Sequence, residues 1–156
     1  MLDFTQKILT SCSKKDISHL PKPIVFTNGC FDILHRGHVT YLQTARNLGK
    51  SLIVGVNSDD SVKRQNKGPD RPINTLEDRL ALLASLACVD AVIPFDEDTA
   101  LNVITSITPQ VLVKGGDWKV EDIVGGEHVI KFGGEVHSIP FEHDRSTTQL
   151  LNRIRN

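Results

Sequence analysis

The sequence of 156 residues is poor in cysteine and has neither a long run of one charge nor a long apolar run. Its three cysteines, Cys12, Cys30 and Cys88, are widely spaced and form no Cys-x-x-Cys pair, which argues against a structural zinc motif and a disulfide framework. The net charge of -1 gives no basis for a general nucleic-acid surface. The longest apolar stretch, residues 80–89, is interrupted by Ser85 and is too short to cross a bilayer. We therefore expect neither a nucleic-acid partner nor a membrane-embedded segment.

The start of the chain also lacks a charged segment followed by an apolar signal core, so we expect a cytoplasmic protein with reduced thiols. The length suits one domain, and we expect residues 1–156 to form it, with residues 1–20 as an N-terminal helical appendage. The apolar residues of this appendage could face a second subunit or pack on their own chain: Leu2, Phe4, Ile8 and Leu9. The sequence therefore leaves open whether the protein forms a homo-oligomer.

Short apolar runs alternate with helical patterns after Pro21 and Pro23, which interrupt any preceding helix. Strands are predicted at 24–27, 52–56, 91–94, 111–113 and 135–139. Helices are predicted at 37–48, 59–65, 76–87 and 98–107, with a short helix inside 125–132 and a last one at 147–154. The alternation predicts an α/β fold: a Rossmann-like, doubly wound, five-stranded parallel sheet with helices on both faces.

The most informative segment is Asn28–His38, which follows the apolar run 24–26. A glycine turn leads there into a helix that opens with His35 and His38, three residues apart and hence on one face. Gly37 between them lets a phosphate approach the backbone, where free N–H groups and the helix dipole attract an anion. This layout predicts an enzyme that acts on the phosphates of a nucleotide.

Two other interpretations of the histidine pair are a capping or core pair and a fragment of a metal site. A catalytic zinc would need a third protein ligand, and His128, His137 or His143 could add one only if the fold brought it close. Nucleotidyl transfer needs neither such a site nor a covalent residue, because a nucleophile attacks the α-phosphorus in line and pyrophosphate leaves. It needs donors to the developing negative charge. We therefore predict no metal-ligating residues.

Further polar clusters follow the second and fourth predicted strands, and in parallel sheets such clusters meet at one edge. Asn57 and Asp59 could contact a nucleotide or a sugar, although Asp59 could equally cap the next helix. Lys67 and Arg71 lie in a loop with glycine and proline and are candidates for clamping phosphates; solvated surface charge is the alternative.

Residues 114–118, Lys-Gly-Gly-Asp-Trp, follow the fourth predicted strand. The glycines allow close backbone approach, Asp117 could accept hydrogen bonds from sugar hydroxyls, and Trp118 could cover a ring. The alternative is a tight turn with a half-buried tryptophan.

Together these segments resemble the cytidylyltransferase-like nucleotidyltransferase superfamily, and within it the heptose 1-phosphate adenylyltransferases. The resemblance runs from about Lys22 to the C-terminus and rests on residues 28–38, 57–60, 67–69, 71–74, 114–118 and 146–148. His-x-Gly-His identifies only the superfamily, whereas Arg-Pro-Ile-Asn and Lys-Gly-Gly-Asp-Trp are narrower. The resemblance implies that the predicted fold is of the nucleotidyltransferase type.

The resemblance also implies that AMP passes from ATP to D-glycero-D-manno-heptose 1-phosphate, normally with Mg²⁺, to give ADP-heptose and pyrophosphate for lipopolysaccharide core or a related glycan. The implied catalytic residues are His35, His38 and Lys67. The implied nucleotide-binding residues are Asn28, Gly29, Cys30, Phe31, Asp32, Gly37, Arg79, Lys114, Gly116, Asp117, Ser146, Thr147 and Thr148. The implied substrate-binding residues are Asn57, Asp59, Arg71 and Trp118. Arg145 differs from the residues found there in relatives, which leaves its role undefined.

Two rival functions share these features. A cytidylyltransferase for a polyol or amino-alcohol phosphate would also carry the histidines and the Ser-Thr-Thr segment, since nucleotide choice rests on small backbone contacts. A non-catalytic nucleotide-sensing module would keep the pocket without turnover, although it could dispense with the full set of phosphate donors.

Overall fold

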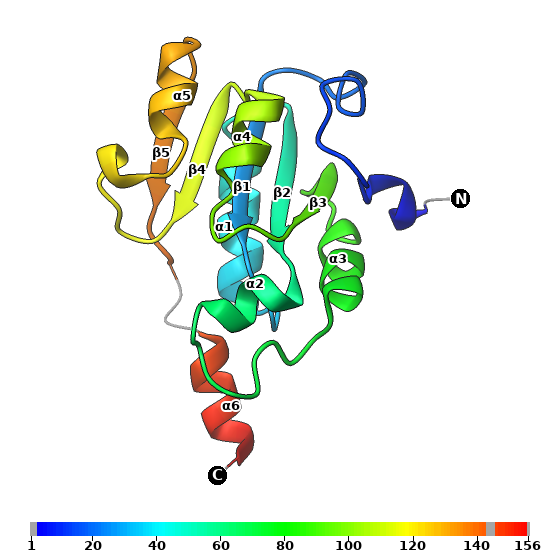
Figure 1. Cartoon of the computed structure of the whole chain (residues 1–156), viewed down its shortest axis with the longest axis vertical. Coiled ribbons are helices and arrows are strands. Elements are labelled where there is room, and N and C mark those ends of the chain that lie inside the picture. Colours follow the sequence, from blue (N-terminus) through cyan, green and yellow to red (C-terminus); the bar gives the residue numbers. More distant parts are fainter. Residues whose placement is uncertain (1–2, 143–145, 156) are drawn as a thin grey trace.

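Five parallel strands form the centre of this computed structural model, which describes residues 3–142 and 146–155 (Figure 1). The strands are β1 (Ile24–Gly29), β2 (Ser51–Asn57), β3 (Ala91–Phe95), β4 (Val111–Gly115) and β5 (Glu135–Ile139). Their order in the sheet is β3-β2-β1-β4-β5, and each neighbouring pair is parallel. The first strand, β1, is thus central; β2 and β3 follow on one side of it, and the chain then crosses to form β4 and β5 on the other side. The predicted doubly wound sheet is confirmed.

Helices cover both faces of this sheet. The helices of the structure are α1 (Arg36–Arg46), α2 (Asp59–Arg64), α3 (Leu76–Ala84), α4 (Leu101–Ile107), α5 (Gly126–Lys131) and α6 (Thr147–Arg155), with 3₁₀ turns η1 (Phe4–Lys7) and η2 (Val120–Asp122). Helix α6 lies beyond the carboxyl ends of the strands and covers neither face (Figure 1). Successive strand side chains point to opposite faces. On β1, Val25 therefore packs in the core beneath α1 and α3, and Phe26 in the core beneath α4 and α5. In Figure 1, α4 lies in front of β1 and α1 behind it.

Two helices begin at side chains that cap them. The hydroxyl of Thr75 accepts a hydrogen bond from the N–H of Asp78 at 3.3 Å and so caps α3. The hydroxyl of Ser58 accepts from the N–H of Ser61 at 3.0 Å and so caps α2. The alternative that Asp59 caps this helix is therefore wrong.

Helix α4 starts later than predicted, at Leu101 rather than Asp98. The carboxylate of Asp98 accepts a hydrogen bond from Nε of Arg64 at 2.8 Å instead of capping the helix, and the capping residue is Ala100. The segment between β3 and α4 is therefore a loop at the carboxyl end of the sheet.

The N-terminal segment packs on its own chain along the β3 edge of the sheet. After η1, Ile8 makes an isolated parallel bridge to Val92. Nζ of Lys7 donates hydrogen bonds to the carbonyl oxygens of Leu86 and Val89, at 3.2 and 2.7 Å. Contact with its own chain, one of the two alternatives for this segment, is thus present.

Where a helical appendage was predicted, residues 3–20 form a short 3₁₀ turn and further turns but no α-helix. Ile17 and Leu20 are buried in the core beneath α4, so this segment completes one face of the sheet. Phe4 stays exposed, and Leu2 lies outside the described residues.

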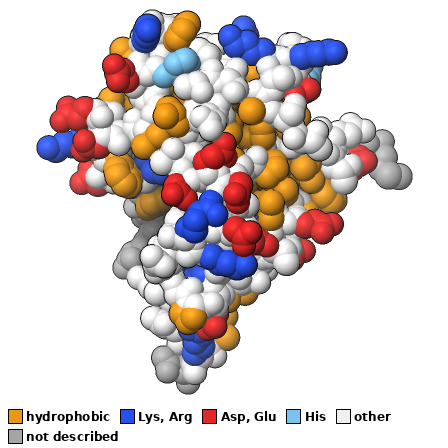
Figure 2. Space-filling model, viewed as in Figure 1, with side chains coloured by type: hydrophobic (Ala, Val, Ile, Leu, Met, Phe, Trp, Pro, Cys, Tyr) orange, Lys and Arg blue, Asp and Glu red, His pale blue; other side chains and the backbone are white. Residues whose placement is uncertain are grey.

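Figure 2 shows acidic and basic side chains interleaved over α2 and the loop after β3. Arg64 pairs there with Asp96 and Asp98, and Lys63 pairs with Asp60. Charge on this part of the surface is therefore mixed in sign. Over residues 3–142 and 146–155, the structure has no helix of the length and apolar character that a membrane span requires.

The packing of the N-terminal segment predicts that Ile17→Ala lowers the free energy of unfolding by about 2–4 kcal/mol, because a buried side chain leaves a cavity. Ile17 is only 5% exposed, whereas Ile154 is 76% exposed. The matched control Ile154→Ala should change stability by less than about 0.5 kcal/mol. Urea unfolding curves measure both, and equal effects would contradict the packing described.

Candidate active site

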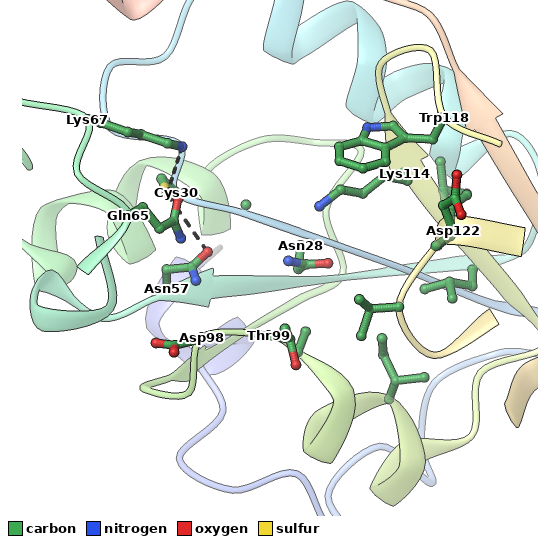
Figure 3. Close-up of a pocket in the computed structure, with 17 residues that line it drawn as sticks. Asn28, Cys30, Asn57, Gln65, Lys67, Asp98, Thr99, Lys114, Trp118 and Asp122 are labelled. Carbon is green, nitrogen blue, oxygen red and sulfur yellow. Dashed lines mark hydrogen bonds between the residues drawn. The ribbon is translucent and has the colours of Figure 1, made fainter. Parts of the chain in front are cut away.

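Two adjacent cavities open at the carboxyl ends of β1, β2 and β4. The Trp118 cavity, about 280 Å³, is lined by Asn28, Gly29, Cys30, Asn57, Gln65, Lys67, Asp98, Thr99, Ala100, Ile104, Leu112, Val113, Lys114, Trp118, Asp122, Ile123 and Val124 (Figure 3). The His38 cavity, about 240 Å³, is lined by Asn28, Gly29, Cys30, Phe31, Asp32, His38, Tyr41, Lys67, Arg71, Lys114, Gly115, Phe141 and Thr147. They share the end of β1 and two lysines, so the polar clusters that follow separate strands do converge.

The two histidines lie at the start of α1 with their rings stacked, 3.8 Å between centroids. His38 lines its cavity, while His35 packs behind it. Burial, together with the neighbouring His35 ring, lowers the pKa of His38 to about 4, although a hydrogen bond to the backbone of Ile33 favours the charged form. His38 is therefore neutral at pH 7 before an anion binds beside it.

Lys67 and Lys114 project into the Trp118 cavity from opposite sides in Figure 3. Nζ of Lys67 donates to Sγ of Cys30 at 3.4 Å. Nζ of Lys114 lies 5.6 Å from the ring centroid of Trp118. Burial and then the charge of Lys67 lower the pKa of Lys114. Two ammonium groups that repel each other form a site for an anion.

Asp32 holds the turn after β1 against the loop that carries Lys67. Its carboxylate accepts hydrogen bonds from the N–H groups of Ile73 and Asn74, each at 2.9 Å, and from Nε of Arg71. Burial raises the pKa of Asp32, but these hydrogen bonds outweigh it and the pKa is lowered. Arg71 is buried in this ion pair, so solvated surface charge is the wrong description of it.

Arg79, which the family resemblance assigns to the nucleotide, is a buried side chain in the structure. Its side chain is fully buried and lines neither cavity. Nη1 donates to the carbonyl oxygens of Cys30 and Asn57 at 2.7 and 2.8 Å, and Nη2 donates to Asp59 at 2.7 Å. Nε donates to the carbonyl of Asn74 at 3.2 Å. Arg79 therefore joins the ends of β1 and β2 to the start of α3, and its contact with a nucleotide stays a prediction.

The last helix begins with a reciprocal cap. The N–H of Gln149 donates to the hydroxyl of Ser146 at 3.1 Å, and the N–H of Ser146 donates back to the Gln149 side chain at 3.2 Å. Thr147 lines the His38 cavity, whereas Thr148 faces the loop 67–71. Arg145 and His143 lie outside the described residues.

Not every predicted site residue lines the Trp118 cavity or the His38 cavity. Those that do are Asn28, Gly29, Cys30, Phe31, Asp32, His38, Asn57, Lys67, Arg71, Lys114, Trp118 and Thr147. Those that do not are His35, Gly37, Asp59, Arg79, Gly116, Asp117, Ser146 and Thr148. Gly116, at φ +115°, shapes the turn that seats Trp118, and Asp117 is exposed. Trp118 lies in this tight turn and also lines a cavity, and its contact with a ligand ring stays a prediction.

Several residues that line the cavities were not predicted from the sequence. Tyr41 could have been found, because it lies three residues after His38 on the same helical face. Gln65, Asp122 and Phe141 carry no local signal, since only the fold brings them to the cavities.

The buried contacts of Arg79 predict that Arg79→Met lowers the free energy of unfolding by about 3–5 kcal/mol, because three carbonyls and a carboxylate lose a partner. Arg64→Met is the matched control: its guanidinium is exposed and pairs with Asp96 and Asp98, so a loss below about 1 kcal/mol is expected. Urea unfolding distinguishes them. A loss of stability in Arg79→Met no larger than that in Arg64→Met would contradict the role of Arg79 in holding these segments together.

The lowered pKa of His38 predicts an acid-sensitive fold. An unfolded histidine titrates near 6.5 and His38 near 4, so between these values the unfolded chain binds more protons. The stabilisation is full above pH 6.5 and is lost as the pH falls toward 4, by up to about 3 kcal/mol. Unfolding of wild type and His38→Gln at several pH values should show a shallower slope in the variant. Parallel slopes would contradict the assignment.

Comparison with known proteins gives consistent results. A model of the cytidylyltransferase-like family matches residues 26–153. A protein named D-beta-D-heptose 1-phosphate adenylyltransferase from Bordetella bronchiseptica is 54% identical over 136 residues, which cover 87% of this chain and 84% of that protein. The bifunctional protein HldE of Shewanella loihica is 58% identical over 131 residues, and this match covers 84% of the chain but only 27% of that protein.

Solved structures share the fold. A lipopolysaccharide core biosynthesis protein from Thermoplasma volcanium is 30% identical with a TM-score of 0.61, over 78% of this chain and 98% of that chain. A pantoate-beta-alanine ligase from Francisella tularensis is 17% identical with a TM-score of 0.57, over 90% of this chain and 68% of that chain, and shows the fold alone. Because the family model spans most of the sequence and a close relative is matched over most of its length, the chain belongs to the cytidylyltransferase-like family.

Proposed function

We propose that this protein transfers AMP from ATP to D-glycero-D-manno-heptose 1-phosphate, which yields ADP-heptose and pyrophosphate. The 54% identity to a heptose 1-phosphate adenylyltransferase supports this activity. The structural observation that carries the proposal is the junction of two cavities at Lys67 and Lys114. Two phosphorylated substrates can meet there, each within reach of the same cations.

The His38 cavity suits the triphosphate of ATP. It lies at the N-terminal end of α1, where backbone N–H groups and the helix dipole attract an anion. The ring of His38 becomes a donor to a phosphate oxygen when the negative charge of the bound phosphates favours its protonated form. Thr147 offers a hydroxyl from the start of α6. His35 supports the ring of His38 by stacking.

The Trp118 cavity suits the heptose phosphate. Asp98, Thr99 and Asp122 line it and provide hydrogen-bond partners for sugar hydroxyls. Lys67 and Lys114 can hold the sugar's phosphate at the junction with the ATP cavity.

In the proposed reaction, a phosphate oxygen of heptose 1-phosphate attacks the α-phosphorus of ATP. A new P–O bond forms as the bond from the α-phosphorus to the bridging oxygen breaks, and pyrophosphate leaves with the electron pair. Lys67, Lys114 and His38 stabilise the charge that develops on the phosphoryl oxygens. No side chain forms a covalent bond.

Mg²⁺ would arrive with ATP as part of the substrate. Among the residues that the structure describes, no cluster of three or more His, Cys, Asp or Glu side chains could hold a metal ion. This suits Mg²⁺, which keeps several waters and binds mainly through phosphate oxygens. The ion would neutralise charge on the triphosphate.

We also propose a cytoplasmic location, a single nucleotidyltransferase domain over residues 1–156 and a product that serves lipopolysaccharide core or a related glycan. The free thiols of Cys12, Cys30 and Cys88 support a reducing compartment. The likeness to a lipopolysaccharide core biosynthesis protein supports the destination of the product. Whether the protein forms a homo-oligomer stays a prediction for sedimentation to test.

Pyrophosphate release tests the reaction. Purified protein should release pyrophosphate with MgATP and the heptose phosphate, and His38→Ala should lower turnover by about 100-fold or more, because a transition-state donor is lost. His19→Ala is the control, since His19 is exposed and lines neither cavity. It should keep full activity.

Three outcomes would contradict the proposal. Strict use of CTP with a polyol or amino-alcohol phosphate would identify the rival cytidylyltransferase. Nucleotide binding without pyrophosphate release from any substrate pair would favour a sensing module. A change of only a few-fold in His38→Ala would remove this residue from the chemistry.

A further inference from the structure

Phe141 is a cavity residue without a role in the core. Of the described residues that line the His38 cavity, it alone has an exposed apolar side chain. Phe141 is 49% exposed, whereas Phe31 and Tyr41, which also line this cavity, are buried. An aromatic ring left half in solvent beside a polar cavity is a candidate ligand contact.

The position of this ring is fixed by its neighbours. Its centroid lies 5.5 Å from that of Tyr41, with the two planes at 55°. A Cβ atom at Gly115 would lie 2.8 Å from Cζ of Phe141, so the absence of a side chain at the end of β4 makes room for the ring. Tyr41 is in turn held by a hydrogen bond between its hydroxyl and that of Thr27 at 2.5 Å. The ring of Phe141 is thus positioned by Tyr41 and by the space that Gly115 leaves.

We propose that Phe141 is the residue against which the base of ATP stacks, an inference that rests on the proposed function. The histidine and lysines of the cavity supply the polar contacts that a triphosphate needs, and Phe141 supplies the apolar surface that a base needs. Stacking on an aromatic side chain is tolerant of base identity but grows with ring area. A purine covers more of Phe141 than a pyrimidine does, which gives a physical reason for preferring ATP to CTP.

Calorimetric binding of two probes with Mg²⁺ tests this role: a non-hydrolysable ATP analogue, and inorganic tripolyphosphate, which has no base. Phe141→Ala should weaken binding of the ATP analogue about tenfold or more and leave tripolyphosphate binding unchanged within about twofold. Phe141→Trp should restore binding of the analogue. The control Phe132→Ala removes another exposed ring, 64% exposed and outside both cavities, and should change neither affinity.

Equal weakening of both probes by Phe141→Ala would overturn the inference, since it would indicate a general disturbance of the cavity. Unchanged binding of the ATP analogue would overturn it too. In either case pyrophosphate release by the wild type would leave the proposed function standing. Absence of that release with MgATP and the heptose phosphate would instead remove the proposed function, independently of Phe141.

Discussion

Two buried guanidinium groups hold together the loops from which both cavities are built. Arg79 ties the carbonyls of Cys30 and Asn57 to the start of α3, and Arg71 ties its own loop to Asp32. Removing such charges from water is costly and is offset only by a full set of hydrogen bonds. Because each guanidinium group joins segments that are far apart in the sequence, the geometry of the cavities depends largely on buried contacts outside them.

This arrangement leaves other cations available to a ligand. Within residues 3–142 and 146–155, neither Lys67 nor Lys114 forms an ion pair with a carboxylate. The buried arginines neutralise Asp32 and Asp59. The lysines lie at the cavity junction, where burial and then the charge of Lys67 lower the pKa of Lys114. A phosphate placed between them would relieve this repulsion. The site is thus organised before a substrate arrives, which is the condition for electrostatic stabilisation of a transition state.

The neutrality of His38 has a related origin. Burial of the His38 ring, and then the neighbouring His35, lower the pKa of His38 to about 4. A neutral imidazole costs less to bury than a charged one, and the negative charge of bound phosphates would favour the protonated form. The fold therefore assigns full positive charge to the lysines, whereas the histidine would gain charge only with bound phosphates.

The sequence by itself determined that a parallel sheet forms, the order of strands and helices along the chain, and the His-x-Gly-His motif. All-apolar runs such as Leu52–Val54 predict strands buried on both faces, and the alternation with helices predicts a parallel sheet. Residues at strand ends, such as Asn57 and Lys114, were identified because parallel strands end at one edge. Helix starts were less predictable, as α4 shows, because competing side-chain contacts decide them.

Only the tertiary structure decided which of these residues are buried and which line the cavities. Arg71 and Arg79 carry the same charge in the sequence as any surface arginine, yet they are buried because Asp32, Asp59 and backbone carbonyls from distant segments surround them. Phe141 likewise gains its place from Gly115 and Tyr41, which lie on other elements. Local pattern records the period of a helix or strand, whereas burial and partner choice are set by contacts between segments that the chain separates.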